Sequence, residues 1–183
     1  MKKFAITILL LFISLILIPN SIFAAGQKRW KNPQNLKTYI QPGYGRSELI
    51  KKAFRAWSAA TKDKVIFYYV DTPEEAQIEV SFGDKIKGTN NPGTAGLTRS
   101  KYLGDEMIHA EILIPVKTSS GIELPQELVY ISMLHEIGHA LGILNHSTNP
   151  QNLMYPTTKN IDKTITKYDL AELYRIYGWK HDF

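Results

Sequence analysis

The clearest pattern along the chain is an alternation of apolar and polar residues, the period of a strand that buries one face. The segment Ala76 to Phe82 alternates in this way, and so does Ile108 to Ile114. Shorter strands are predicted at Leu36 to Ile40, at the β-branched and aromatic run Lys64 to Val70, and at a sheet edge over Ala95 to Arg99. The Gly-, Asn- and Pro-rich stretch from Gly83 to Gly93 predicts a loop.

Three other segments have the features of helices. Ser47 to Thr61 spaces its apolar residues three and four apart, which predicts an amphipathic helix with one face packed inward. Pro125 suits the first position of a second helix. Thr166 and Asp169 form an N-terminal capping signature for a third helix, which Gly178 ends.

The N-terminus has the parts of a secretory signal peptide. Two lysines precede an uncharged apolar run from Phe4 to Ile18, and Pro19 to Ala25 supplies a break and small residues. Because the run is short for a bilayer span, we expect residues 1–24 to be removed and residues 25–183 to form one secreted domain. An uncleaved membrane anchor is the alternative.

Composition excludes several classes of function. Loss of Lys2 and Lys3 with the signal lowers the formal net charge from +5 to +3, and no basic stripe interleaved with aromatics indicates nucleic-acid binding. The absence of cysteine excludes disulfides, thiolate metal sites and lipid-modified cysteine. We therefore expect an extracellular monomer, stabilised by its core and a bound metal, without stable membrane association after cleavage.

The residues with the most specific chemistry are His135, Glu136 and His139, within the sequence HEIGH. Residues four apart on a helix lie one turn above the other, so both imidazoles can bind one zinc ion. Glu136 is then placed to take a proton from a water on that metal, as in a metalloprotease. Gly142 can adopt a positive φ, end the helix and let a third ligand return to the ion, for which His146 is the candidate.

The segment His146-Ser147, Asn149-Pro150 and Leu153-Met154-Tyr155-Pro156, together with HEIGHALG, resembles the matrixins among the metzincin zinc peptidases. The usual motif has two residues between the glycine and the third histidine, whereas three intervene here, so strict register puts Asn145 at the ligand position. The downstream spacing favours His146 with one residue inserted in the turn, since loops absorb such insertions.

This resemblance implies the α+β, zincin-like metzincin catalytic domain: a twisted, mostly parallel five-stranded sheet with an antiparallel edge strand and three helices. It also implies one catalytic Zn²⁺ held by His135, His139 and His146, with Glu136 as the base for peptide hydrolysis. Met154 would form the hydrophobic floor of the Met-turn, and the peptide or protein substrate would contact a set of edge-strand and wall residues: Ala95, Gly96, Leu97, Tyr155 and Pro156. Loop oxygens also allow Ca²⁺, from Asp84, Asn90, Asn91, Asp105 and Glu106.

Three alternatives remain at this stage. The first is an extracellular zinc-binding module without proteolysis, which the general base Glu136 disfavours because a structural site needs none. The second is a metzincin of another branch that uses Asn145 or solvent as third ligand. The third is a membrane-tethered interaction protein built around the apolar N-terminus, which the globular pattern of residues 25–183 disfavours.

Overall fold

The computed structural model describes residues 26–83, 96–117, 121–157 and 163–181. Within these ranges the elements follow in the order β1 (Leu36–Ile40), α1 (Ser47–Ala60), β2 (Phe67–Tyr69), the 3-10 turn η1 (Pro73–Glu75), β3 (Ile78–Gly83), β4 (Leu97–Leu103), β5 (Glu106–Pro115), α2 (Gln126–Ala140) and α3 (Lys167–Tyr177). Every predicted strand and helix is present, although several begin or end at other residues. Most of the predicted loop after Gly83, together with Ala95, lies outside the described residues.

Two boundaries differ from the predictions for clear reasons. The strand predicted from Lys64 begins only at Phe67, as β2. The residues before it belong to the turn that follows α1, in which Lys62 and Asp63 have positive φ. Pro125 lies just before α2 and not at its first turn, because its ψ of 146° is extended. Its carbonyl still accepts the first helical hydrogen bond, from Val129 at 3.1 Å.

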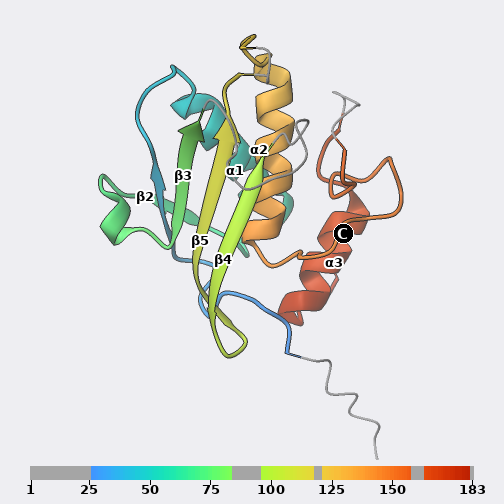
Figure 1. Cartoon of the computed structure of the whole chain (residues 1–183). Coiled ribbons are helices and arrows are strands. Elements are labelled where there is room, and N and C mark those ends of the chain that lie inside the picture. The colour runs from blue at the N-terminus through green and yellow to red at the C-terminus, as the bar shows by residue number, and fades with distance from the viewer. Residues whose placement is uncertain (1–25, 84–95, 118–120, 158–162, 182–183) are drawn as a thin grey trace, which may run out of the picture.

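The strands form one sheet in the order β2-β1-β3-β5-β4 (Figure 1). All neighbouring pairs are parallel except β4 and β5, which are antiparallel and joined by a short turn. The expected mostly parallel sheet with an antiparallel edge strand and three helices is therefore confirmed. Because β4 is the last strand in the order, one of its edges faces away from β5.

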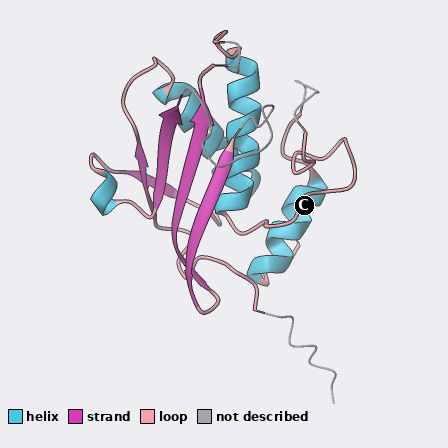
Figure 2. Cartoon of the chain, viewed as in Figure 1, coloured by secondary structure: helices cyan, strands magenta, loops and turns pink. Residues whose placement is uncertain are grey.

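Helices α1 and α2 lie together on one side of the strands, and α3 stands beyond α2, away from the sheet (Figure 2). The predicted alternation of β3 supplies this side with buried Ile78, Val80 and Phe82. Trp57 joins the helices: it is fully buried on α1, and its indole N–H donates to the carbonyl of Leu134 on α2 at 2.9 Å. This hydrogen bond fixes the position of α2 along its axis at Leu134, the residue before His135.

The segment before β1 secures the other end of α2. The buried indole of Trp30 donates to the carbonyl of Ala140 at 2.7 Å, and the hydroxyl of Tyr177 on α3 donates to that of Leu141 at 3.0 Å. These carbonyls end the helix and have no partner within it. Trp30 and Tyr177 therefore hold the point at which the chain leaves α2 and turns back.

The part of the chain that the structure describes contains no helix that is both long and apolar enough to span a bilayer.

Candidate metal centre and active site

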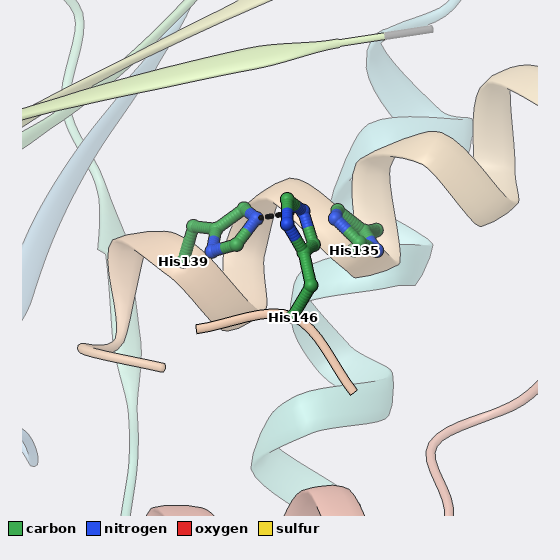
Figure 3. Close-up of side chains that lie close together, drawn as sticks. All are labelled: His135, His139 and His146. Atoms are coloured by element: carbon green, nitrogen blue, oxygen red, sulfur yellow. Dashed lines mark hydrogen bonds between the residues drawn. The ribbon is translucent and has the colours of Figure 1, made fainter. Parts of the chain in front are cut away.

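His135, Glu136 and His139 lie in the last two turns of α2. The side chain of His146 comes from the segment that follows the helix and lies beside those of His135 and His139 (Figure 3). The three imidazoles each offer a ring nitrogen, and these nitrogens all lie within 4.8 Å of one another. The Nε2 atoms of His139 and His146 are 3.2 Å apart. The turn thus brings His146 next to the pair that helical spacing had placed together.

The turn that returns His146 depends on Gly142. Its φ of +107° lies in the region that L-residues with a side chain avoid. A Cβ at this position would also approach the carbonyl oxygen of Lys28 to 2.5 Å. The turn therefore requires glycine for two reasons: the positive φ, and the close packing of the N-terminal segment at Lys28.

Two of the histidines are oriented by backbone carbonyls. Nδ1 of His135 lies 2.9 Å from the oxygen of Leu153, and Nδ1 of His139 lies 2.6 Å from the oxygen of Ile143. A carbonyl only accepts, so each Nδ1 carries the hydrogen and each Nε2 keeps a lone pair. Such orientation of a metal-binding histidine by a second contact is typical of zinc sites.

The electrostatics favour the neutral form that metal binding requires. Burial lowers the pKa of His135 to about 3 and that of His139 to about 4, with the neighbouring histidines contributing in the same direction. Burial also lowers the pKa of His146, which is the most exposed of the three. Three neutral imidazoles are a donor set that suits zinc and leaves a fourth position open.

Glu136 is buried beside this cluster, with 6% of its surface exposed. Burial raises the pKa of its carboxyl to about 7, against the opposing effect of a hydrogen bond from Thr98. Thr98 Oγ1 lies 2.7 Å from Glu136 Oε2. A carboxyl whose pKa is close to neutral can both accept and return a proton at physiological pH.

Comparison with known proteins decides which family this arrangement represents. Residues 34–178 match the matrixin peptidase family. The chain is a matrixin. Matrixins are zinc metalloendopeptidases, and within the described residues the three clustered histidines form a group that could hold a metal ion.

Relatives agree with this assignment, and a solved structure shares the fold. Human matrix metalloproteinase-15 is 28% identical over 179 residues, covering 85% of this chain and 26% of its own length. Matrix metalloproteinase-18 of Xenopus laevis is 32% identical over 139 residues, covering 70% of this chain and 28% of its own. The matrixin thus spans only about a quarter of these relatives. The structure of myroilysin shares the fold, with a TM-score of 0.55, 12% identity and coverage of 81% and 82% of the two chains.

The methionine of the predicted Met-turn is buried close to the cluster. The sulfur of Met154 packs against Gly138 of α2, and its carbonyl accepts from the backbone N–H of Ser147 at 2.7 Å. Tyr155 follows, half-buried, with the ammonium of Lys163 5.0 Å from its ring centre, and Pro156 is exposed. The sequence gives no sign of this role for Lys163, which is buried and whose ammonium also donates to the carbonyl of Thr157 at 2.8 Å.

The start of the predicted edge strand lies against the side chain of Glu136. Leu97 begins β4, and Gly96 precedes it against the Glu136 side chain, whereas Ala95 is outside the described residues. The sequence predicts Thr98 in the edge strand but not its contact with Glu136. Alternation along the strand predicts that Thr98 shares one face with Ser100 and Tyr102. It does not predict that this face packs against α2.

Asn145, the alternative third ligand, lies beside His146 on the wall of a cavity of about 370 Å³ between this segment and α3. The cavity is also lined by Tyr168 and Glu172 of α3. Of the residues proposed for calcium, Asp105 pairs with Lys28 at 3.2 Å, and Asp84, Asn90 and Asn91 lie outside the described residues. Calcium binding therefore stays a prediction.

Asp169 has two roles, of which sequence analysis predicted one. Its carboxylate completes the capping box of α3 with Thr166, as expected. The same carboxylate accepts from the backbone N–H groups of Leu153 at 3.2 Å and Met154 at 3.1 Å. One buried side chain thus ties the start of α3 to the turn under the histidine cluster.

Replacing Asp169 with alanine is expected to lower the free energy of unfolding by about 3 kcal/mol, because several buried N–H and O–H donors lose their acceptor. Urea unfolding of the metal-free protein would measure this loss. Glu172→Ala is the matched control on the same helix: its exposed pair with Arg175 contributes at most about 1 kcal/mol. Equal losses for the two variants would show that Asp169 does not hold the turn.

Proposed function

We propose that this matrixin is a secreted endopeptidase that hydrolyses peptide bonds, with His135, His139 and His146 as zinc ligands and Glu136 as the general base. The observation that carries the proposal is the buried carboxyl of Glu136, which directly follows His135 on α2 and precedes His139 by three residues, two members of the histidine cluster. A structural zinc site does not require a neighbouring carboxyl whose pKa is raised to near 7.

Zinc, when bound, would lower the pKa of a water molecule and polarise the carbonyl of the scissile bond. The protein's own groups do the rest. Glu136 takes a proton from the attacking water and later gives it to the leaving amine, which a carboxyl with a pKa of about 7 can do in both directions. The Nδ1 contacts of His135 and His139 keep both rings oriented with Nε2 free to bind the metal.

The substrate is proposed to bind as an extended peptide along β4. This strand is the edge of the sheet, and an edge strand offers backbone N–H and C=O groups to an added strand. A peptide beside Gly96 and Leu97 would run past Glu136, which touches the start of β4. Ala95, which the family resemblance also implies as a substrate contact, lies outside the described residues. Tyr155 and Pro156 would line the pocket after the scissile bond, with Met154 as the floor beneath the metal.

We also propose that residues 1–24 are a signal peptide, that residues 25–183 are released outside the cell, and that the product is a monomer. The apolar run from Phe4 to Ile18 and the small residues that follow support cleavage after Ala24. Trp30 is buried against the end of α2, so little chain separates the proposed cleavage site from the folded domain.

The test is to express the full chain in a secreting host and purify the protein from the medium. We expect a monomer whose N-terminus begins near Ala25 by mass spectrometry and which cleaves an unstructured protein substrate. A zinc chelator should abolish cleavage, and added zinc should restore it. Purified protein that holds one zinc ion per chain but cleaves no member of a broad peptide library would contradict the peptidase and favour a non-catalytic zinc module.

A further inference from the structure

The contact between β4 and the Glu136 side chain is long-range and specific. Thr98 Oγ1 lies 2.7 Å from Glu136 Oε2 and 3.0 Å from the backbone oxygen of the same residue. The two residues are 38 positions apart in the chain, and Thr98 is partly buried where β4 passes α2. A carboxylate can only accept, so the threonine hydroxyl donates to it.

Gly96 forms the other side of the same contact. A Cβ at this position would come within 2.5 Å of Glu136 Cγ and 2.7 Å of Oε1. The carboxylate therefore lies against bare backbone on one side and receives a hydroxyl on the other. No side chain larger than hydrogen at position 96 would leave Glu136 where it is.

We propose that Thr98 is a positioning residue for the base Glu136, with Gly96 leaving the space that the carboxylate occupies. This proposal rests on the peptidase function proposed above. A glutamate has several rotatable bonds, and a charged hydrogen bond to one of its oxygens restricts them. The second oxygen, Oε1, is left to exchange the proton with the attacking water.

The hydroxyl can serve Glu136 throughout a turnover. While Glu136 is a carboxylate, the Thr98 O–H donates to Oε2. When Oε1 has taken the proton from water, the Thr98 O–H still donates to Oε2, which keeps its lone pairs. No proton is gained or lost by Thr98, and the carboxyl keeps a partner in both states.

The test compares Thr98→Val, which keeps the branched shape and removes the hydroxyl, with Thr98→Ser, which keeps the hydroxyl. The kcat of Thr98→Val is expected to fall by about ten- to a hundredfold, the range for a hydrogen bond to a charged group. Its KM and zinc content should stay close to those of the unchanged protein, and Thr98→Ser should retain most of the kcat. Thr72→Val is the matched control: it removes a threonine hydroxyl outside β4, which donates to Glu75 at 3.3 Å, and should not change kcat.

Several results would overturn the proposal. One is a Thr98→Val protein with unchanged kcat; another is a Thr98→Ser protein as impaired as Thr98→Val, since packing and not the hydroxyl would then matter. If Thr98→Val does not fold, the same comparison between Thr98→Ala and Thr98→Ser decides. An unchanged chain that binds zinc yet cleaves nothing would contradict the peptidase function and this proposal together. An active chain insensitive to Thr98→Val would contradict only the role of Thr98.

Discussion

Changing Glu136 to glutamine is expected to lower kcat for peptide hydrolysis by about 10³-fold, within the range that general acid–base catalysis contributes. Glutamine has the same shape and can still bond to Thr98, but it cannot take a proton from water. The zinc content should not change, because Glu136 is not among the three residues whose ligand atoms cluster. Single-turnover cleavage of a fluorogenic peptide, with metal analysis of the same sample, measures both quantities.

Glu127→Gln is the matched control for this substitution. Glu127 lies in the first turn of the same helix and is exposed, so its loss removes the same charge from α2 at a distance from the cluster. We expect nearly unchanged kcat. If Glu136→Gln also retained full activity, the assigned base would be wrong and a different group would have to accept the proton.

Changing His146 to alanine is expected to weaken zinc binding by more than about a hundredfold, since even loss of a group that only orients a ligand costs 10- to 100-fold. Two histidines on α2 would remain, and their ring nitrogens alone do not complete a zinc site. Asn145→Ala should leave the affinity almost unchanged, because an amide is a poor zinc ligand. Competition with a calibrated chelator would give both affinities.

His109→Ala controls for the loss of any histidine. His109 lies on β5, with Nε2 at 3.9 Å from Glu79 and 3.7 Å from Glu111, and is not part of the cluster. Its removal should not affect zinc binding. A larger loss of affinity for Asn145→Ala than for His146→Ala would move the third ligand to Asn145 and place the extra residue of the turn after the ligand position.

Several features of the site could be predicted because they depend on neighbours in sequence. Any α-helix places residues four apart, such as His135 and His139, on one face. Glu136 could be assigned as the base because it lies next to His135 in the same short motif. The capping box of Thr166 and Asp169 and the left-handed end at Gly178 are also local, and both are present. The alternation of β3 predicted which of its side chains are buried, and that of β5 did so for Ala110, Ile112 and Ile114, since a strand has a period of two. Ile108 is exposed and Met107 is buried instead, because the pairing of β5 with β4 shifts register there.

The remaining features depend on which elements pack together. The hydroxyl of Thr98 reaches Glu136 only because β4 is the edge strand beside α2, and Asp169 reaches Leu153 and Met154 only because α3 lies under that turn. Trp30 meets the end of α2 across 110 positions of the chain. No local pattern encodes such partners, because each hydrogen bond joins segments whose approach is determined by the burial of other side chains.

By itself, then, the sequence determined the elements, the zinc-binding chemistry and the acidic residue beside it, because helical and strand periods and caps act over a few residues. Only the tertiary structure decided that His146 returns to the pair on α2, that burial brings the pKa of Glu136 near neutrality, and which groups orient both. Desolvation and long-range contacts are properties of the packed molecule, and they exist only once sheet and helices have come together.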